Sequence, residues 1–396
     1  ANNRYGYFPP AALRWRISNE NFAPKKTFDD LSLRLNWGIT GNQEFPSYAS
    51  QAVTQLLLNG DRLTVTNPSP DLKWETQTTY GAGIDFSVLK GRVGGSIDYF
   101  NKSTKDLLFL QEYPQPSAAT RRWLNLPGKV VNRGVELGLT IGLVQKKAFN
   151  WELIYNATFL DNEVKDFGSR NVVTGDMNGP GLTGAYVQVI RSDASLGSFY
   201  LPRFTGFDAQ GFNQFEGENA PSYIIGSNIP KFSSGLTNNF TFGKFNANLF
   251  INAATGFYVY NETKNAYFVK GALFRGRNVD YEAATSSENP ANTAPVSTRF
   301  LEKGDFIRLA NASLGYTFDV TNMKPFKTLR LTVSGQNLVL LTKYSGLDPE
   351  VSTNKARLPS GSTASTSPQE GIPSRGIDYG AYPNPRTFTF SINAGF

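Results

Sequence analysis

The chain has 396 residues, of which 18% are charged and 13% aromatic, and its formal net charge is +7. It contains neither Cys nor His, which excludes disulfides, thiol chemistry, zinc sites built on these residues and His-based acid–base catalysis. The basic residues are scattered along the sequence, which does not favour nucleic-acid binding. No apolar run reaches the roughly 18 residues of a membrane-spanning helix. A membrane β-barrel needs an apolar residue only at every second strand position, so the composition is compatible with one.

Apolar and polar residues alternate along eleven segments, as in strands that face lipid on one side and water on the other. In chain order the expected strands lie near 10–17, 31–39, 76–88, 91–101, 135–143, 149–159, 231–242, 245–255, 305–318, 327–340 and 386–396. Most run about ten residues, the length that crosses a bilayer at a tilt of about 45°. Aromatic residues such as Trp37, Tyr99 and Phe159 lie near the ends of the apolar faces, where interfacial girdles are expected. The pattern predicts an all-β fold, a transmembrane antiparallel β-barrel.

The connections between these strands alternate in length. Short or medium connections fall at 18–30, 88–91, 144–148, 242–245 and 319–327, and long ones at about 40–75, 102–131, 162–230, 256–304 and 341–385. Outer-membrane barrels have short periplasmic turns and longer extracellular loops, so the long connections are assigned to the outside. The first and the eleventh strand then both run toward the periplasm.

Two strands that run in the same direction do not close an antiparallel barrel, and an unpaired strand edge leaves backbone groups unsatisfied in lipid. We therefore expect residues 1–396 to be the C-terminal part of a barrel. The strand near 10–17 and the strand 386–396 are expected to pair with strands outside this sequence. No signal peptide opens the chain, so either the mature chain was cut or an N-terminal portion is missing. The final strand carries Phe388, Phe390 and Phe396, which we expect to act as the outer-membrane insertion signal.

The long connections hold the candidate contact residues. Residues 162–230 carry Tyr186, Phe199, Tyr200, Phe204 and Phe207, which either meet a protein partner or ligand or pack the loop against its neighbours. Trp123, with Arg121 and Arg122, is a candidate for stacking on a sugar or pairing with an anionic substrate. No catalytic constellation, phosphate loop or metal-ligand spacing is found, so no cofactor and no metal are predicted.

Stretches along the whole sequence resemble the C-terminal barrel region of the SusC/RagA-type TonB-dependent outer-membrane transporters of Bacteroidetes. The matching stretches are Arg4–Pro9, Leu33–Gln43, Asn67–Pro68, Asp71–Glu75, Asn132–Glu136, Gly197–Tyr200, Phe300–Leu309, Gly346–Val351, Gly376–Gly380 and Tyr382–Phe388. The resemblance implies a 22-stranded barrel with a plugged lumen. These eleven strands would be its C-terminal half, with the N-terminal plug domain and the first barrel half absent from this sequence.

The resemblance further implies nutrient import across the bacterial outer membrane. The chain would supply barrel wall and extracellular loops of an importer that is coupled to TonB through the missing N-terminal region. The importer would take up oligosaccharide or peptide together with a SusD-like surface lipoprotein. The alternative is a passive porin or a surface adhesion barrel, and a plug domain inside the lumen would distinguish the two. An enzyme is not expected, because no activated nucleophile stands out.

Overall fold

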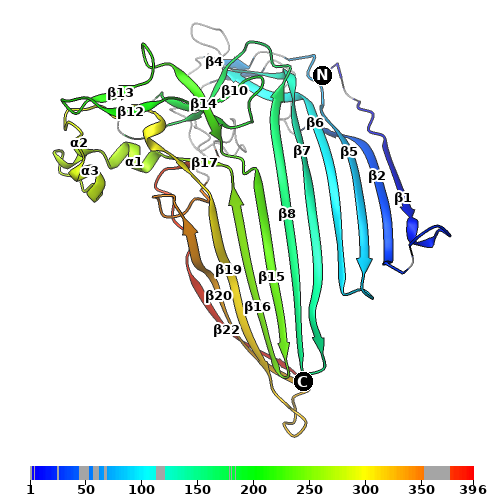
Figure 1. Cartoon of the computed structure of the whole chain (residues 1–396). Coiled ribbons are helices and arrows are strands. Elements are labelled where there is room, and N and C mark those ends of the chain that lie inside the picture. The colour runs from blue at the N-terminus through cyan, green and yellow to red at the C-terminus, as the bar shows by residue number, and fades with distance from the viewer. Residues whose placement is uncertain are drawn as a thin grey trace.

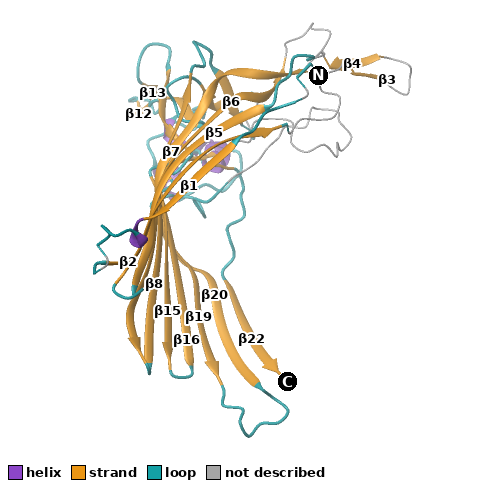
Figure 2. Cartoon of the chain, turned by 90° about the vertical axis from the view of Figure 1, so that its right-hand side faces the viewer, coloured by secondary structure: helices purple, strands orange, loops and turns teal. Residues whose placement is uncertain are grey.

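The computed structural model describes residues 2–3, 5–24, 26–43, 53–56, 62–66, 69–112, 121–177, 179, 181–182, 184–351 and 375–396, without the side chains of 53–56, 62–66, 109–112 and 121–122. One large, curved and twisted sheet forms the body of the molecule, and the long connections gather at its upper end (Figures 1 and 2). The N-terminus lies at that upper end and the C-terminus at the lower end (Figure 1).

Eleven antiparallel strands form the large sheet, and they pair in the order of the chain. They are β1 (Pro10–Arg16), β2 (Phe28–Asn42), β5 (Glu75–Val88), β6 (Val93–Glu112), β7 (Arg121–Lys146), β8 (Phe149–Lys165), β15 (Phe232–Phe242), β16 (Phe245–Thr255), β19 (Phe306–Thr317), β20 (Thr328–Thr342) and β22 (Thr387–Gly395). All eleven expected strands are confirmed. The sheet is open, with β1 and β22 at its two edges. These two strands run in the same direction as each other, which the connection lengths predicted.

One connection differs from its expectation. Residues 102–131 were expected to be a long loop, but β6 and β7 continue as a paired hairpin through Glu112 and Arg121. A register shift between Lys105 and Leu107, where Asp106 has a positive φ, lets the ladder continue past the membrane. Residues 101–106 are all polar, so no apolar alternation marks this part of the hairpin, which is why the sequence pattern ended too early.

The apolar face of the sheet has the dimensions of a lipid-facing band. Aromatic rings pair across strands at both ends of this face, Phe159 with Phe232 at the upper end (4.7 Å between centroids) and Phe149 with Phe242 at the lower end (6.3 Å). Phe149 and Phe159 are ten residues apart on β8, or about 33 Å along the strand. A tilt of about 40° reduces this to about 25 Å, the height of the apolar band of outer-membrane barrels. We name these two rows of rings the upper and the lower girdle.

A charged residue introduced in the middle of this band should show which face of the sheet meets lipid. Leu236 lies midway along β15 on the apolar face, beside Tyr155 and Ile251, and Thr237 points to the opposite face. In the full-length protein, Leu236→Arg should destabilise the folded barrel by about 2–4 kcal/mol. Thr237→Arg, one residue away, should cost much less, because the lumen accepts charge. Denaturant unfolding in lipid vesicles measures both. Equal losses would contradict the face assignment.

The remaining elements form a second layer of structure above the upper girdle. They are β9 (Val172–Asp176), β10 (Tyr186–Ile190), β11 (Ser198–Pro202), β12 (Phe204–Phe207), β13 (Asn213–Phe215), β14 (Ser222–Ser227), β17 (Tyr258–Asn261), β18 (Leu301–Lys303), β21 (Ile377–Asp378), α1 (Glu262–Tyr267), α2 (Lys270–Leu273), α3 (Tyr281–Thr285) and η2 (Thr298–Phe300). The short helix η1 (Ile17–Asn19) follows β1, and the hairpin β3 (Val53–Leu56) and β4 (Arg62–Thr66) lies in the first long connection. Within the described residues, no helix is long and apolar enough to cross a membrane.

Candidate functional site

Three long connections fold together into one packed body at the extracellular end, which we name the cap. Its sheet β14-β11-β10-β9 comes from the connection 162–230, and β17 pairs with β18 from the connection 256–304. The third connection joins them because β21 lies parallel to β17, with Tyr260 beside Ile377. The carbonyl of Arg375 also accepts hydrogen bonds from Gln188 (2.8 Å) and Asn228 (2.7 Å). These backbone and side-chain bonds make the cap a single structural unit.

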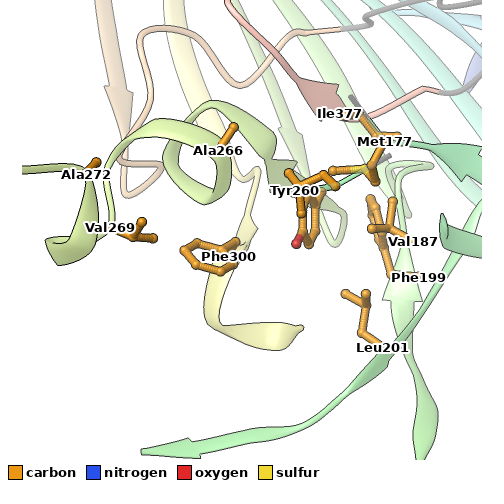
Figure 3. Packing of buried hydrophobic residues seen from close by; sticks show 11 residues of the cluster. Met177, Val187, Phe199, Leu201, Tyr260, Ala266, Val269, Ala272, Phe300 and Ile377 are labelled. Atoms are coloured by element: carbon orange, nitrogen blue, oxygen red, sulfur yellow. The ribbon is translucent and has the colours of Figure 1, made fainter. Parts of the chain in front are cut away.

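The cap has its own hydrophobic core. Tyr260 lies at its centre, with Phe300 on one side and Val187 and Phe199 on the other (Figure 3). The Tyr260 hydroxyl donates a hydrogen bond to Asn265 Oδ1 at 2.7 Å, so the buried phenol is satisfied. Burial is the main cause that raises the pKa of Tyr260. The core is completed by Met177, Leu182, Leu201, Ala266, Val269, Ala272 and Ile377.

A buried ion pair fixes the helical part of the cap. The Arg299 guanidinium binds both carboxylate oxygens of Glu288, at 2.7 and 2.8 Å, and the Lys270 backbone N–H at the start of α2 also donates to Glu288. Burial is the largest single effect and would raise the pKa of Glu288, but the hydrogen bonds from Arg299, the Lys270 N–H and Asn292, together with the Arg299 charge, outweigh it and hold the pKa below its usual value. The same guanidinium lies over the rings of Phe204 (5.7 Å) and Phe207 (5.0 Å). These two rings therefore pack the cap through a cation–π contact.

A second buried cluster joins the cap to the barrel. Arg308, near the upper end of β19, binds the Asp348 carboxylate in a bidentate pair at 2.7 and 3.1 Å, and both side chains are about 95% buried. Asp348 also accepts the backbone N–H of Glu350 (2.9 Å) and the amide of Asn384 (3.3 Å). Burial alone would raise the pKa of Asp348, but these bonds, led by those from Arg308, lower it. The Glu350 carboxylate lies 2.9 Å from Arg308, and burial raises its pKa.

Trp123 lies where a ligand can reach it. It lines a hollow of about 580 Å³ at the upper part of the β6–β7 hairpin, within the size range of small-molecule sites. The walls of the hollow also carry Asp71, Lys73, Asp106, Asn125 and Arg170. The Ser69 hydroxyl binds the Trp123 carbonyl, and the Asn125 amide binds the carbonyls of Lys73 (3.0 Å) and Asp106 (2.7 Å). The hollow thus combines one indole with charged and amide groups.

The other candidate contacts fall in different places. Phe199 is fully buried in the cap core, so of the two alternatives for this residue it packs the loop against its neighbours and does not reach a partner. Tyr200, Phe204 and Phe207 are half-buried, whereas Tyr186 on β10 is 41% exposed. Arg121 and Arg122 begin β7, but their side chains lie outside the described residues. A role of Tyr186 and Trp123 in binding stays a prediction.

Sequence reasoning missed two strongly exposed aromatic residues of the cap. Phe274 (72% exposed) follows α2 and Tyr281 (84% exposed) begins α3, and these two short helices lie side by side (Figure 1). The Asp280 side chain caps α3 by accepting the Ala283 N–H at 2.7 Å. An Asp residue at the N-cap position is a sequence signal for the start of a helix, and here it stands in a segment that lacks the alternation of a strand. This signal could have predicted α3, whose first residue is Tyr281. We name Phe274, Tyr281 and the neighbouring Leu273 the helical patch.

The polar face of the sheet carries a network of ion pairs. On β2, Arg34 binds Asp85 of β5 and Asp98 of β6, each at 2.8 Å, and Arg14 of β1 lies 3.7 Å from Asp85. These charges alternate along their strands with exposed Leu13 and Leu35, as in a water-facing wall. No group of His, Asp or Glu side chains in the described part of the chain is arranged to hold a metal ion.

The last strand exposes its aromatic side chains. Phe388 is 62%, Phe390 79% and Phe396 69% exposed, and the Phe396 ring lies 5.2 Å from that of Phe326. Because β22 is an edge of the sheet, these rings lie on the apolar face beside an unpaired backbone. Their role in insertion stays a prediction.

An apolar band of membrane thickness, a polar inner face and a folded extracellular cap define the wall of an outer-membrane β-barrel. Residues 1–338 match the family model described as TonB dependent receptor-like, beta-barrel, and the chain belongs to this family. It lies in the outer membrane, where these receptors form β-barrels.

Relatives and solved structures agree with this assignment. The chain is 28% identical to the TonB-dependent receptor SusC of Bacteroides thetaiotaomicron over its whole length, which is 40% of that protein. It is equally similar to a TonB-dependent receptor of Formosa agariphila, of which it covers 42%. A solved structure of the RagAB peptide transporter has the same fold, with a TM-score of 0.80 at 20% identity, and the chain covers 44% of it. The chain thus spans less than half the length of these relatives.

Proposed function

We propose that the chain forms the C-terminal half of a 22-stranded barrel in an outer-membrane nutrient importer. The supporting observation is the open sheet, whose edge strands β1 and β22 each pair with only one strand in the described part of the chain. In lipid the backbone groups at an open sheet edge require further strands. A plug domain and a TonB-contacting segment, encoded outside these residues, would supply gating and energy.

The cap supports a role in capture and release of cargo with a surface lipoprotein of the SusD type. Its fused core makes it a rigid platform, and the helical patch offers exposed apolar area for such a partner. The hollow at Trp123 supports a polar cargo with a stackable face, an oligosaccharide or a peptide.

Energy coupling separates this importer from a passive porin or an adhesion barrel. Uptake of labelled oligosaccharide or peptide by cells that express the full-length protein should stop when an uncoupler collapses the proton-motive force. Uptake that continues unchanged would favour the porin, and the absence of uptake would favour the adhesion barrel.

The Trp123 side chain should contribute directly to cargo binding. Trp123→Ala in the full-length protein should weaken binding of the transported cargo by about 1 kcal/mol, or roughly fivefold, because the stacking surface is lost. Trp123→Phe keeps an aromatic face and should retain most of the affinity. Equilibrium binding of matched oligosaccharide and peptide libraries measures both variants. A binding constant that is unchanged in Trp123→Ala would remove this hollow as the cargo site.

A further inference from the structure

The five connections at the lower end of the sheet share an unusual charge. They are the residues 17–27, 89–92, 147–148, 243–244 and 318–327, and all lie at the lower ends of their strands (Figure 1). In the described part of these connections the basic side chains are all exposed: Lys26, Lys90, Arg92, Lys147, Lys244, Lys324 and Lys327. We name these seven residues the basic rim.

The basic rim is only partly neutralised by the protein itself, although Asp29 Oδ2 accepts the Gly91 N–H at 3.0 Å between Lys90 and Arg92. The described parts of the same connections hold only two acidic residues, Glu20 and Asp319. Glu20 accepts the indole N–H of Trp15 at 3.0 Å. Within the described residues, the one ion pair of the rim joins Lys244 to Asp319 at 3.7 Å. Seven basic against two acidic residues leave an excess of five positive charges, most of the chain's net charge of +7.

The rim lies directly below the lower girdle. Lys147 lies two residues before Phe149, and Lys244 sits between Phe242 and Phe245, whose ring packs on Tyr316 at 4.8 Å. One or two residues correspond to about 3–7 Å along a strand. A long Lys side chain extends its ammonium group farther toward water. The charges therefore lie at the height of the lipid head groups, below the apolar band.

The connection between β19 and β20 shows how one lipid would fit. Lys324 and Lys327 line a shallow hollow together with Phe318 and Phe326. Phe318 packs edge-on against Tyr316 at 4.8 Å, so the hollow continues the aromatic girdle. Cationic side chains beside aromatic rings suit a phospholipid whose phosphate lies against the lysines and whose first acyl carbons lie against the rings.

We propose that the basic rim binds the anionic head groups of phospholipids in the periplasmic leaflet of the outer membrane. This fixes the height of the barrel in the bilayer and enriches acidic lipid around it. Each Lys or Arg near an anionic membrane surface strengthens the binding of a protein to that surface about fivefold. The proposal rests on the outer-membrane location and on the rim, and it is independent of the cargo and of TonB.

Native mass spectrometry of the full-length protein tests the rim with phosphatidylglycerol and phosphatidylcholine as probes. The rim variant carries Lys147→Gln, Lys244→Gln, Lys324→Gln and Lys327→Gln. The control variant neutralises four exposed lysines outside the rim, with Lys105→Gln, Lys231→Gln, Lys303→Gln and Lys343→Gln. The wild type and the control should retain phosphatidylglycerol in preference to phosphatidylcholine. The rim variant should bind phosphatidylglycerol at least tenfold more weakly, and salt should reduce the preference of the wild type.

Three results would overturn the proposal. The first is undiminished phosphatidylglycerol retention by the rim variant. The second is displacement of the lipid by an equal concentration of inorganic phosphate, which would show a site for free anions. The third is that the rim variant keeps its lipid but no longer retains an acidic periplasmic protein that the wild type retains in a pull-down, which would identify a protein as the partner of the rim. If the quadruple variant does not fold, the double variant Lys324→Gln with Lys327→Gln replaces it. Both lysines line the hollow, and their loss should weaken phosphatidylglycerol binding at least fivefold. An unchanged affinity of the double variant would also overturn the proposal.

Discussion

In the full-length protein, Asp348→Asn should release the connection after β20 from the barrel and cost about 3 kcal/mol or more in local stability. The amide cannot balance the Arg308 guanidinium, which remains about 96% buried beside it. Removing one partner of a buried pair typically costs about 3–5 kcal/mol, and the half-exposed Glu350 carboxylate, 2.9 Å from Arg308, compensates only part of this loss. Hydrogen exchange at Tyr344–Val351 should therefore accelerate more than a hundredfold.

Glu350→Gln is the matched control for this prediction. Glu350 contacts the same guanidinium, but its side chain is 43% exposed. Burial raises the pKa of Glu350, which means that its charged form pays a desolvation cost. Removing the charge in Glu350→Gln removes this cost together with the ion pair. We expect little change in exchange for Glu350→Gln, and partial recovery when Asp348→Asn is combined with Arg308→Met. Similar losses in both single variants would show that charge burial is not what holds this junction.

The Arg308–Asp348 pair makes the stability of this junction depend on pH. Because the pKa of folded Asp348 lies below its ordinary value, the carboxylate stabilises the junction fully at pH values above the unfolded pKa of about 4. This stabilisation should be lost as the pH falls from there through the lowered, folded pKa. The protection factor at Tyr344–Val351, which divides out the slower intrinsic exchange in acid, should therefore decrease on acidification in the wild type and change less in Asp348→Asn.

Phe199→Ala should unfold the cap while leaving the barrel intact. Phe199 is fully buried between the cap sheet and Tyr260, and truncation of a buried Phe costs about 3–5 kcal/mol through lost burial and the remaining cavity. The cap core is separate from the lipid-facing band, so the strands of the sheet should keep their protection from hydrogen exchange.

Tyr186→Ala provides the comparison on the neighbouring strand. Its ring is 41% exposed, and we expect a loss of less than about 1 kcal/mol. If Tyr186→Ala weakens binding of a surface lipoprotein at unchanged cap stability, Tyr186 belongs to the partner surface. Equal destabilisation by both variants would contradict the view that the cap core is centred on Phe199 and Tyr260.

The sequence predicted the sheet closely and the cap poorly. Strand alternation is a local property that lipid on one side and water on the other impose on each residue, so β15 and β16 were placed within one residue of their observed ends. The cap follows no such period. For Phe199, in an aromatic-rich loop, the sequence leaves a surface contact and loop packing open, because its neighbours in space, Tyr260 and Ile377, come from two other connections.

By itself, then, the sequence determined the strands, their directions and the face that each turns to lipid, because these depend on residues two positions apart. Only the tertiary structure decided which loop residues are buried, which carboxylate joins Arg308, and that lysines from five separate turns form one basic rim. Those relations join residues far apart in the chain, and no local pattern encodes them.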